Sequence, residues 1–217
     1  MNKVYSTEAG RPFAQRKYLP FHRQLLSLIF LLCVGCAMIP AHGQNIDIDL
    51  LKSINPSHPH SAILKTTGQS AYYLPVGFAA GSIGYGIISK DKKLRERGYE
   101  LVLSMGLSAI ITQSLKYTID RERPADRYPN DVFVEKPVHG RSFPSGHTTI
   151  AFAAATTVTL QYKKWYIAVP AYLWAGAAGY SRIYAGEHYP SDVLAGAAVG
   201  IGSAYLAHWI SGKLFKN

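Results

Sequence analysis

The sequence predicts an all-α fold, a multi-span bundle of helices in a membrane. Five runs of 15 to 24 residues contain no Lys, Arg, Asp or Glu, and short polar segments separate them. The longest run is sufficient to cross a bilayer, which takes about 20 apolar residues. The mean hydropathy is only +0.01, so a soluble all-helical bundle remains the alternative.

The net charge of +10 is concentrated where these runs end. Residues 1–23 carry five Lys or Arg and one acidic residue. Residues 90–97 carry five Lys or Arg and two acidic residues. Further cations are Lys163, Lys164, Lys213 and Lys216. Basic residues at alternate ends of apolar segments are the positive-inside pattern of a membrane protein. A nucleic-acid-binding protein would carry them on one face, so we expect no nucleic-acid partner, and no obligate protein partner is evident.

Residues 1–43 predict a signal peptide or an N-terminal anchor. A basic segment ends at Arg23, an apolar stretch covers Leu25–Ile39, and Ala41-His42-Gly43 offers small residues for cleavage. Cleaved or kept as an anchor, this segment would deliver Gln44 to the outside of the cell. Both cysteines lie within it, so the cleaved chain would contain no disulfide and no thiol nucleophile.

Residues 44–70 form a lead-in segment. Ile46, Leu50 and Ile54 recur every four residues beside two aspartates, which predicts a short amphipathic helix lying on the membrane surface. Asn55-Pro56 would end this helix.

Residues 71–217 form the main domain, with about five membrane spans. The first apolar run, Thr66–Ser89, would enter the cell and place Lys90–Arg97 in the cytoplasm. A helix over Gly98–Arg123 would return outward, and a polar loop over residues 124–141 would follow. The remaining runs are Thr148–Tyr162, Trp165–Ser181 and Val193–Gly212. In this topology every cytoplasmic end is basic, and three polar clusters meet at the outer face.

The first two clusters combine cations with a helix start. Lys116 and Arg123 are seven residues apart, two helical turns, so both would project from one side of a helix that Pro124 ends. In the second cluster, Ser142–Thr148, Ser145 is a good N-cap and Gly146 lets a ligand approach the first turn. Free backbone N–H groups there favour an oxyanion, and His147 would stand over it.

The third cluster is Ser181–Asp192. His188 and Asp192 are four residues apart, so the carboxylate can reach a ring nitrogen and fix the imidazole tautomer. Pro190 suits the first turn of a helix, where Asp192 would meet the positive end of the dipole. Arg182 adds a guanidinium.

These clusters admit two chemistries. A metal site could use His147, His188 and Asp192, but the three cations would repel a divalent ion. The same cations suit the charge of a pentacoordinate phosphoryl transition state. The sequence therefore predicts a phosphate site with no metal and no cofactor.

Three strings carry a resemblance to a known family: Lys116-x6-Arg123-Pro124, Pro144-Ser145-Gly146-His147 and Ser181-Arg182-x5-His188-x3-Asp192. In order and spacing they match the signature of the type 2 phosphatidic acid phosphatase superfamily. That superfamily includes membrane lipid phosphatases, bacterial class A acid phosphatases and vanadium haloperoxidases. Residues 186–196 are most similar to the membrane branch, which includes undecaprenyl diphosphate phosphatases, although Glu187 stands where an apolar residue is frequent.

The resemblance implies the helical fold of this superfamily and a metal-independent phosphoric monoester or diphosphate hydrolase. The enzyme would lie in the cytoplasmic (inner) membrane with its active site facing the periplasm or cell exterior. His188 would attack phosphorus and form a phosphohistidine, Asp192 would orient its ring, and His147 would protonate the leaving oxygen and later activate water. The groups expected to hold the phosphoryl oxygens are Lys116, Arg123, Arg182, Ser145 and Gly146.

Several alternatives stay open at this point. Undecaprenyl diphosphate is the first candidate substrate, followed by phosphatidic acid, phosphatidylglycerophosphate and lipid A phosphates. Gly140–Thr148 is also similar to a class A motif, which keeps a secreted soluble acid phosphatase as an alternative. A lipid phosphotransferase would differ only in the group that accepts the phosphate. A non-enzymatic membrane protein that carries a solute would need polar groups near the membrane midplane, where we find only Ser, Thr and His208.

Overall fold

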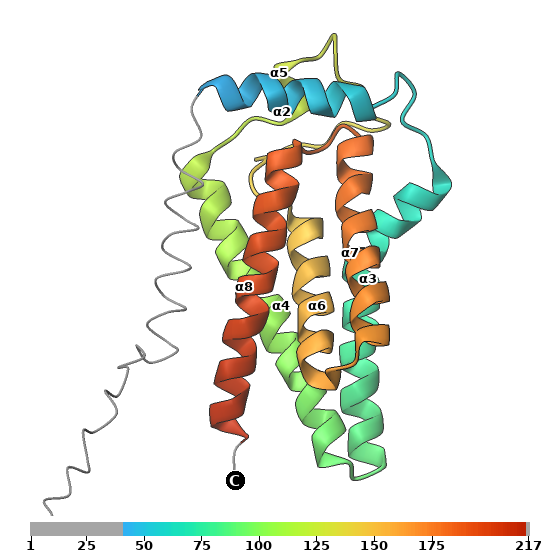
Figure 1. The fold of residues 1–217 in the computed structure, drawn as a ribbon, viewed down its shortest axis with the longest axis vertical. Coiled ribbons are helices and arrows are strands. Elements are labelled where there is room, and N and C mark those ends of the chain that lie inside the picture. The colour runs from blue at the N-terminus through green and yellow to red at the C-terminus, as the bar shows by residue number, and fades with distance from the viewer. Residues whose placement is uncertain (1–40, 216–217) are drawn as a thin grey trace, which may run out of the picture. The chain divides into compact units, whose positions relative to one another are not determined.

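The computed structural model describes residues 41–215, and side chains from Ile46 onward. All regular secondary structure in this part of the chain is helical (Figure 1). The signal or anchor segment predicted for residues 1–43 lies outside the described residues, except for residues 41–43, which begin the first described helix.

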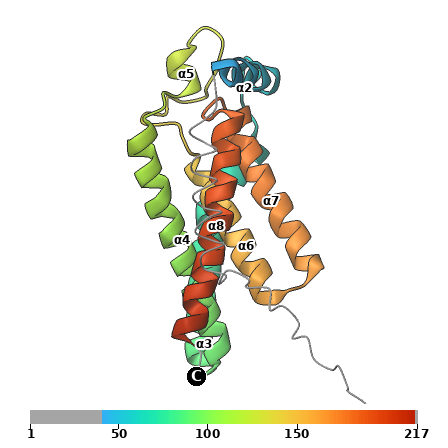
Figure 2. The same cartoon turned by 60° about the vertical axis from the view of Figure 1, so that its left-hand side comes forward.

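Five long helices run beside one another: α3 (Ala62–Ile88), α4 (Lys92–Ile119), α6 (Gly146–Tyr162), α7 (Trp165–Tyr184) and α8 (Pro190–Leu214). A shorter helix, α2 (Ala41–Ile54), lies across the end of the bundle where α6 and α8 begin (Figures 1 and 2). The loop between α4 and α6 contains α5 (Pro124–Arg127), a single turn. The five long helices predicted from the apolar runs are confirmed.

Helix α6 is the centre of the bundle, because it packs against α3, α4, α7 and α8. Its buried residues from Thr148 to Thr157 are almost all Ala or Thr, whose small side chains let neighbouring backbones approach closely. Helix α8 uses this room. A Cβ added at Gly196 would lie 2.7 Å from the Ser145 carbonyl oxygen, and one at Gly200 would overlap the Thr149 carbonyl oxygen.

The bundle has apolar outer faces and a partly polar interior. By length and composition, α3 and α8 could each cross a membrane, with mean hydropathies of 1.2 and 1.5. Large exposed apolar side chains include Leu74, Val76, Ile87, Ile88, Ile110, Leu173 and Leu194. Buried polar side chains include Ser104, Ser108, Thr112, Thr149, Thr156 and Thr157. Apolar residues outside and small polar residues between helices are typical of a bundle in lipid.

The predicted helix over Gly98–Arg123 was wrong at its C-terminal end. Helix α4 ends at Ile119, and Asp120 adopts the left-handed conformation with φ of 48°. Asp is one of the few residues that tolerate this conformation, and Pro124 disfavours a helical Arg123. Pro124 therefore begins α5 at its first position instead of ending α4, and Arg123 is the N-cap of α5.

The helix predicted in the lead-in segment is present as α2, but two of the three residues of its predicted apolar stripe face outward, and only Ile54 packs against the core. Ile46 and Leu50 are 70% and 48% exposed, whereas Asp47, Ile48 and Leu51 are buried. Ile48 and Leu51 form a cluster with Val132, Ile183 and Tyr189, on the loop before α6, on α7 and at the start of α8. The inward face was missed because it includes a charged residue, Asp47, whose partner is distant in the sequence.

The close packing of α8 on α6 predicts opposite effects for two glycines of the same helix. Gly200→Ala should lower the free energy of unfolding by about 1–3 kcal/mol, because the new methyl group overlaps the backbone of α6. A methyl group added at Gly202 would have no heavy atom within 4 Å, so Gly202→Ala should be neutral or stabilise by up to about 1 kcal/mol. Thermal unfolding of the detergent-solubilised variants measures both, and equal midpoints would contradict the packing.

Candidate active site

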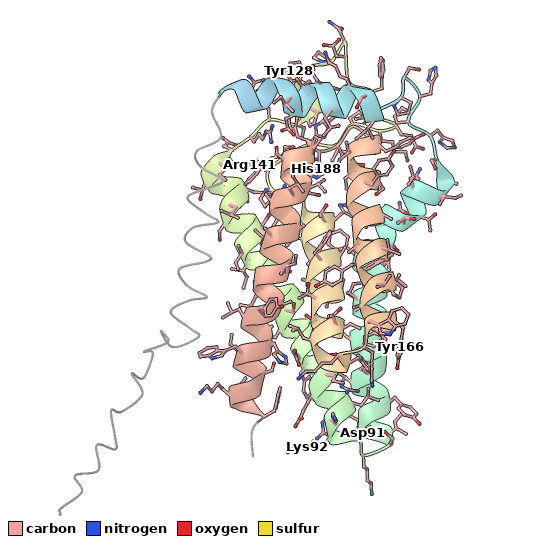
Figure 3. The ribbon with its side chains drawn as sticks, in the orientation of Figure 1. Asp91, Lys92, Tyr128, Arg141, Tyr166 and His188 are labelled. Atoms are coloured by element: carbon pink, nitrogen blue, oxygen red, sulfur yellow. The ribbon has the colours of Figure 1, made fainter. Side chains whose placement is uncertain are left out.

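The three polar clusters meet at the end of the bundle that α2 covers. His188 lies there, just before α8, and Arg141 lies nearby in the loop before α6 (Figure 3). The clusters come from the end of α4, the start of α6 and the connection from α7 to α8. The predicted topology also brought these three clusters together at one end of the bundle.

His188 and Asp192 form a buried pair. His188 Nδ1 lies 3.4 Å from Asp192 Oδ2, and the two side chains are 3% and 0% exposed. Helix α8 begins at Pro190, so His188 precedes the helix. Asp192 is the N3 residue of a capping box and accepts a hydrogen bond from the Tyr189 backbone N–H at 3.0 Å. The predicted contact is thus present, produced by the start of the helix instead of by a helical turn.

Ser142 completes the surroundings of this carboxylate. Its hydroxyl donates to Asp192 Oδ2 and lies 3.5 Å from His188 Nδ1. Because the Asp192 carboxylate can only accept, the proton of a neutral His188 belongs on Nδ1. Nε2 then carries the free lone pair that a nucleophile needs.

Lys116 and Arg123 are held by backbone carbonyl groups. Lys116 Nζ donates to the carbonyl oxygen of Arg141 at 2.6 Å. Arg123 donates to Gly140 O from Nε at 3.1 Å and to Glu187 O from Nη1 at 2.9 Å. Asp120 and Glu122, the acidic residues between these two cations in the sequence, form no ion pair with either; Asp120 pairs with Arg141 instead.

Arg182 is the most enclosed of the three cations. Its side chain is 7% exposed, and its Nη1 lies 3.1 and 3.3 Å from the two carboxylate oxygens of Glu187. Helix α3 packs directly on the guanidinium, because a Cβ at Gly68 would overlap Arg182 Nη2. Glu187 therefore contacts both arginines, Arg123 through its carbonyl oxygen and Arg182 through its carboxylate.

His147 is the second residue of α6 and directly precedes the apolar run Thr148–Tyr162. Its ring is half-buried and meets the ring of Tyr72 edge-on, with 4.6 Å between centroids. Ser145 is the N-cap residue of α6, as predicted, but its hydroxyl accepts from the Thr148 hydroxyl instead of capping a backbone N–H. The Ser145 backbone N–H donates to Asp192 O at 3.0 Å, which joins the starts of α6 and α8.

The surroundings lower the pKa of both imidazoles. Burial, with smaller contributions from Arg182, His188, Arg123 and Lys116, lowers the pKa of His147 to about 3. Burial also lowers the pKa of His188; Asp192 opposes this shift, and the charges of Arg123 and Lys116 add to it. Arg123 and Lys116 act on both rings, so the structure brings the predicted residues into one site, in which the neutral form of both histidines is favoured.

Two charged residues of the site, Arg121 and Asp47, were not predicted from the sequence. Arg121 Nη1 donates to Asp192 Oδ1 at 2.7 Å, and its guanidinium lies 3.7 Å from the centre of the Tyr189 ring. Arg121 Nη2 donates to Asp47 Oδ2 at 2.7 Å, and Asp47 Oδ1 accepts from the Ser191 backbone N–H at 2.9 Å. Helix α2 is thereby joined to the carboxylate that orients His188.

Comparison with known proteins finds similar sequences and a similar solved structure. The chain is 36% identical over 137 residues to the lipid A 1-phosphatase of Porphyromonas gingivalis, covering 62% of this chain but only 28% of that protein. It is 28% identical to the undecaprenyl-diphosphatase of Sulfolobus acidocaldarius, covering 88% of this chain and 91% of the relative. The crystal structure of Aquifex aeolicus LpxE is similar with a TM-score of 0.59 and 31% identity, covering 76% of this chain and 95% of LpxE.

The match to a family is more extensive than any single motif. Residues 97–216, which include every residue of the three clusters, match the PAP2 superfamily. Together with the all-helical bundle and the site at its end, this match shows that the chain belongs to the PAP2 superfamily.

Proposed function

We propose that this protein is a membrane phosphatase that removes phosphate from a lipid phosphate or diphosphate through a phosphohistidine on His188. The observation that carries the proposal is the buried His188–Asp192 pair, surrounded by cations and facing a second histidine. The names of the relatives, lipid A 1-phosphatase and undecaprenyl-diphosphatase, support this substrate class.

The proposed reaction has two steps. His188 Nε2 attacks phosphorus while the bond to the leaving oxygen breaks, and His147 gives that oxygen its proton. His147 then takes a proton from water as the water oxygen attacks phosphorus and the N–P bond breaks. Lys116, Arg123 and Arg182 stabilise the charge of the phosphoryl oxygens, helped by Ser145 and the Gly146 backbone.

Substrate binding would favour the protonated His147 that the first step requires. With a pKa of about 3, His147 is neutral near pH 7. A phosphate group brings negative charge that offsets the three cations, which raises the pKa of His147 again. A substrate whose phosphate is singly protonated can also deliver the proton directly, since the second pKa of a phosphate ester is about 6.

The outer surface of the bundle supports a lipid substrate. An apolar groove of about 470 Å³ lies between α3, α6 and α7, lined by Leu74, Phe78, Val158 and Trp174 among others. Tyr73 of α3 also lines this groove, and the residue before it, Tyr72, contacts His147. A hydrocarbon chain in this groove would keep its phosphate near the site. Undecaprenyl diphosphate and lipid A phosphates remain candidates, with phosphatidic acid and phosphatidylglycerophosphate.

We place the active site on the periplasmic or outer side of the cytoplasmic membrane, in a chain with about five spans. Asp91 and Lys92 lie at the end of the bundle opposite His188 (Figure 3), and the α6–α7 turn at Lys163 and the C-terminal end of α8 share that end. Basic ends favour the cytoplasm, which supports this orientation. Residues 1–43 would be a signal or anchor, 44–70 the lead-in segment and 71–217 the phosphatase domain.

Replacement of the nucleophile tests the proposed function directly. His188→Ala should lower phosphate release by at least about 10³-fold, because it removes the proposed nucleophile that forms the covalent intermediate. The assay uses detergent-purified full chain with chelator, and undecaprenyl diphosphate, phosphatidic acid and p-nitrophenyl phosphate as parallel substrates. His139→Ala, in an exposed part of the loop before α6, is the matched control. Retained activity in a folded His188→Ala protein would remove His188 from this role.

The role of His147 predicts a dependence on the leaving group. His147→Asn should lower turnover of an alkyl phosphate by about 10²- to 10⁴-fold, because the alkoxide must be protonated as it leaves. Measured as kcat/KM, which reports the first step and not the later attack of water, the same variant should lose far less with p-nitrophenyl phosphate, whose leaving group is stable as an anion. Equal losses of kcat/KM on the two substrates would show that His147 does not protonate the leaving oxygen.

The contacts of Asp47 predict an effect of α2 on catalysis. Asp47→Asn removes the charge that holds Arg121 and the start of α8, so His188 should be less well oriented and kcat should fall about tenfold with little change in KM. Asp49→Asn, on the exposed face of the same helix, should behave as the unmodified protein. A matching loss in both variants, or an effect confined to thermal stability, would contradict a positioning role.

A further inference from the structure

A small cavity with a mixed apolar and charged lining lies beside the candidate site, between the start of α3, the loop before α6 and the connection after α7. Its volume is about 240 Å³. The charged and amide side chains that line it are Lys65, Gln69, Glu135, Lys136, Arg182 and Glu187. Nothing in the proposed phosphate chemistry uses this space except Arg182, whose guanidinium the cavity shares with the phosphate site.

The cavity lies on the side of the site where the leaving group departs. Lys65, Gln69 and Tyr72 are spaced four and three residues apart on α3, so they share one face of that helix. Lys65 and Gln69 line the cavity, and Tyr72 meets the ring of His147. Because His147 donates the proton to the leaving oxygen, the rest of the leaving group continues along this face into the cavity.

The size of the cavity sets a limit on what enters it. Pockets that enclose drug-sized molecules measure about 300–1,000 Å³. A cavity of about 240 Å³ therefore takes one ring or a short headgroup, and the hydrocarbon part of a lipid must lie elsewhere.

The charges of the cavity favour an uncharged occupant. With Arg182 assigned to the phosphoryl group, the remaining charges are two lysines and two glutamates, which cancel. Lys65 is already paired with Glu135, with 2.8 Å between Nζ and Oε1. A second phosphate in this space would find no unopposed pair of cations and would face the Glu187 carboxylate.

The Glu187 carboxylate shares Arg182 with the proposed phosphate site. It accepts from Arg182 Nη1, and its side chain is 19% exposed. A phosphoryl group that binds Arg182 competes for that guanidinium. The largely buried Glu187 carboxylate then needs other hydrogen-bond donors, and hydroxyl groups on the leaving group can provide them.

We infer that this cavity is a leaving-group subsite for an uncharged, polyhydroxylated headgroup such as a sugar ring, and that Glu187 is the residue that selects it. The inference rests on the proposed function and narrows it. A sugar phosphate joined to a lipid fits the site, whereas a diphosphate places its second phosphate against Glu187.

The test compares three soluble substrates with the detergent-purified full chain: glucose 1-phosphate, hexyl phosphate and hexyl diphosphate. The unmodified protein should show a kcat/KM for glucose 1-phosphate about tenfold or more above that for the other two. Glu187→Leu should lose this advantage, with hexyl phosphate unchanged within about threefold and hexyl diphosphate improved. Glu187→Gln keeps a hydrogen-bond acceptor, so its kcat/KM for glucose 1-phosphate should be retained. Its kcat/KM for hexyl diphosphate should rise, because the negative charge is gone.

The control and the contrary outcomes are distinct. Glu122→Leu, at an exposed glutamate outside the cavity, should leave all three ratios unchanged. A parallel loss on all three substrates in both Glu187 variants would mean that Glu187 only holds Arg182, and would overturn the inference. So would a preference of the unmodified protein for the diphosphate. In either case, hydrolysis of hexyl phosphate that His188→Ala abolishes would leave the proposed function standing.

Discussion

A carboxylate with no exposure to solvent must receive its hydrogen bonds from the protein, and Asp192 receives them from separate parts of the chain. One oxygen accepts from the Tyr189 backbone and from Ser142, beside His188, and the other accepts from Arg121. These donors come from the start of α8, the loop before α6 and the loop after α4, while Asp47 adds α2 through Arg121. Any displacement of one segment leaves a buried charge short of a partner, so ordering these loops and orienting His188 are one event.

The bundle makes this meeting of loops feasible by bringing α6 and α8 into backbone contact. Small residues on α6 and Gly196 and Gly200 on α8 let the two backbones approach closely, and the Ser145 N–H bonds directly to Asp192 O. The N-terminal ends of both helices therefore point at the same place. Both contribute the positive end of a dipole, but only α6 offers first-turn N–H groups to a ligand, because the Ser191 N–H of α8 already donates to Asp47.

Much of this arrangement follows from local sequence, and the exceptions have physical reasons. The apolar runs predicted the five long helices, and the spacing of His147, His188 and Asp192 predicted residues that do converge. Local pattern failed at Asp120, where the backbone conformation of one residue ended α4 early. It failed again at Asp47, whose inward orientation depends on Arg121, 74 residues away. Pairs so distant leave no periodic signal, and the apolar spacing of Ile46 and Leu50 indicated the opposite face.

Arg121 and Arg123 are two residues apart, yet their partners give them different tasks. Arg121 binds two carboxylates, so its charge is neutralised within the structure and serves to fix Asp192. Arg123 binds carbonyl oxygens, and Lys116 does the same. Carbonyl groups hold a cation in place without cancelling its charge, so these two cations keep their field for a phosphate and need no reorganisation when it arrives. Arg182 differs again, because its carboxylate partner, Glu187, must give way. In the proposed reaction, the substrate would therefore meet two prepared cations and a third for which it competes with Glu187, and the displaced carboxylate would be free to contact whatever group the phosphate is attached to.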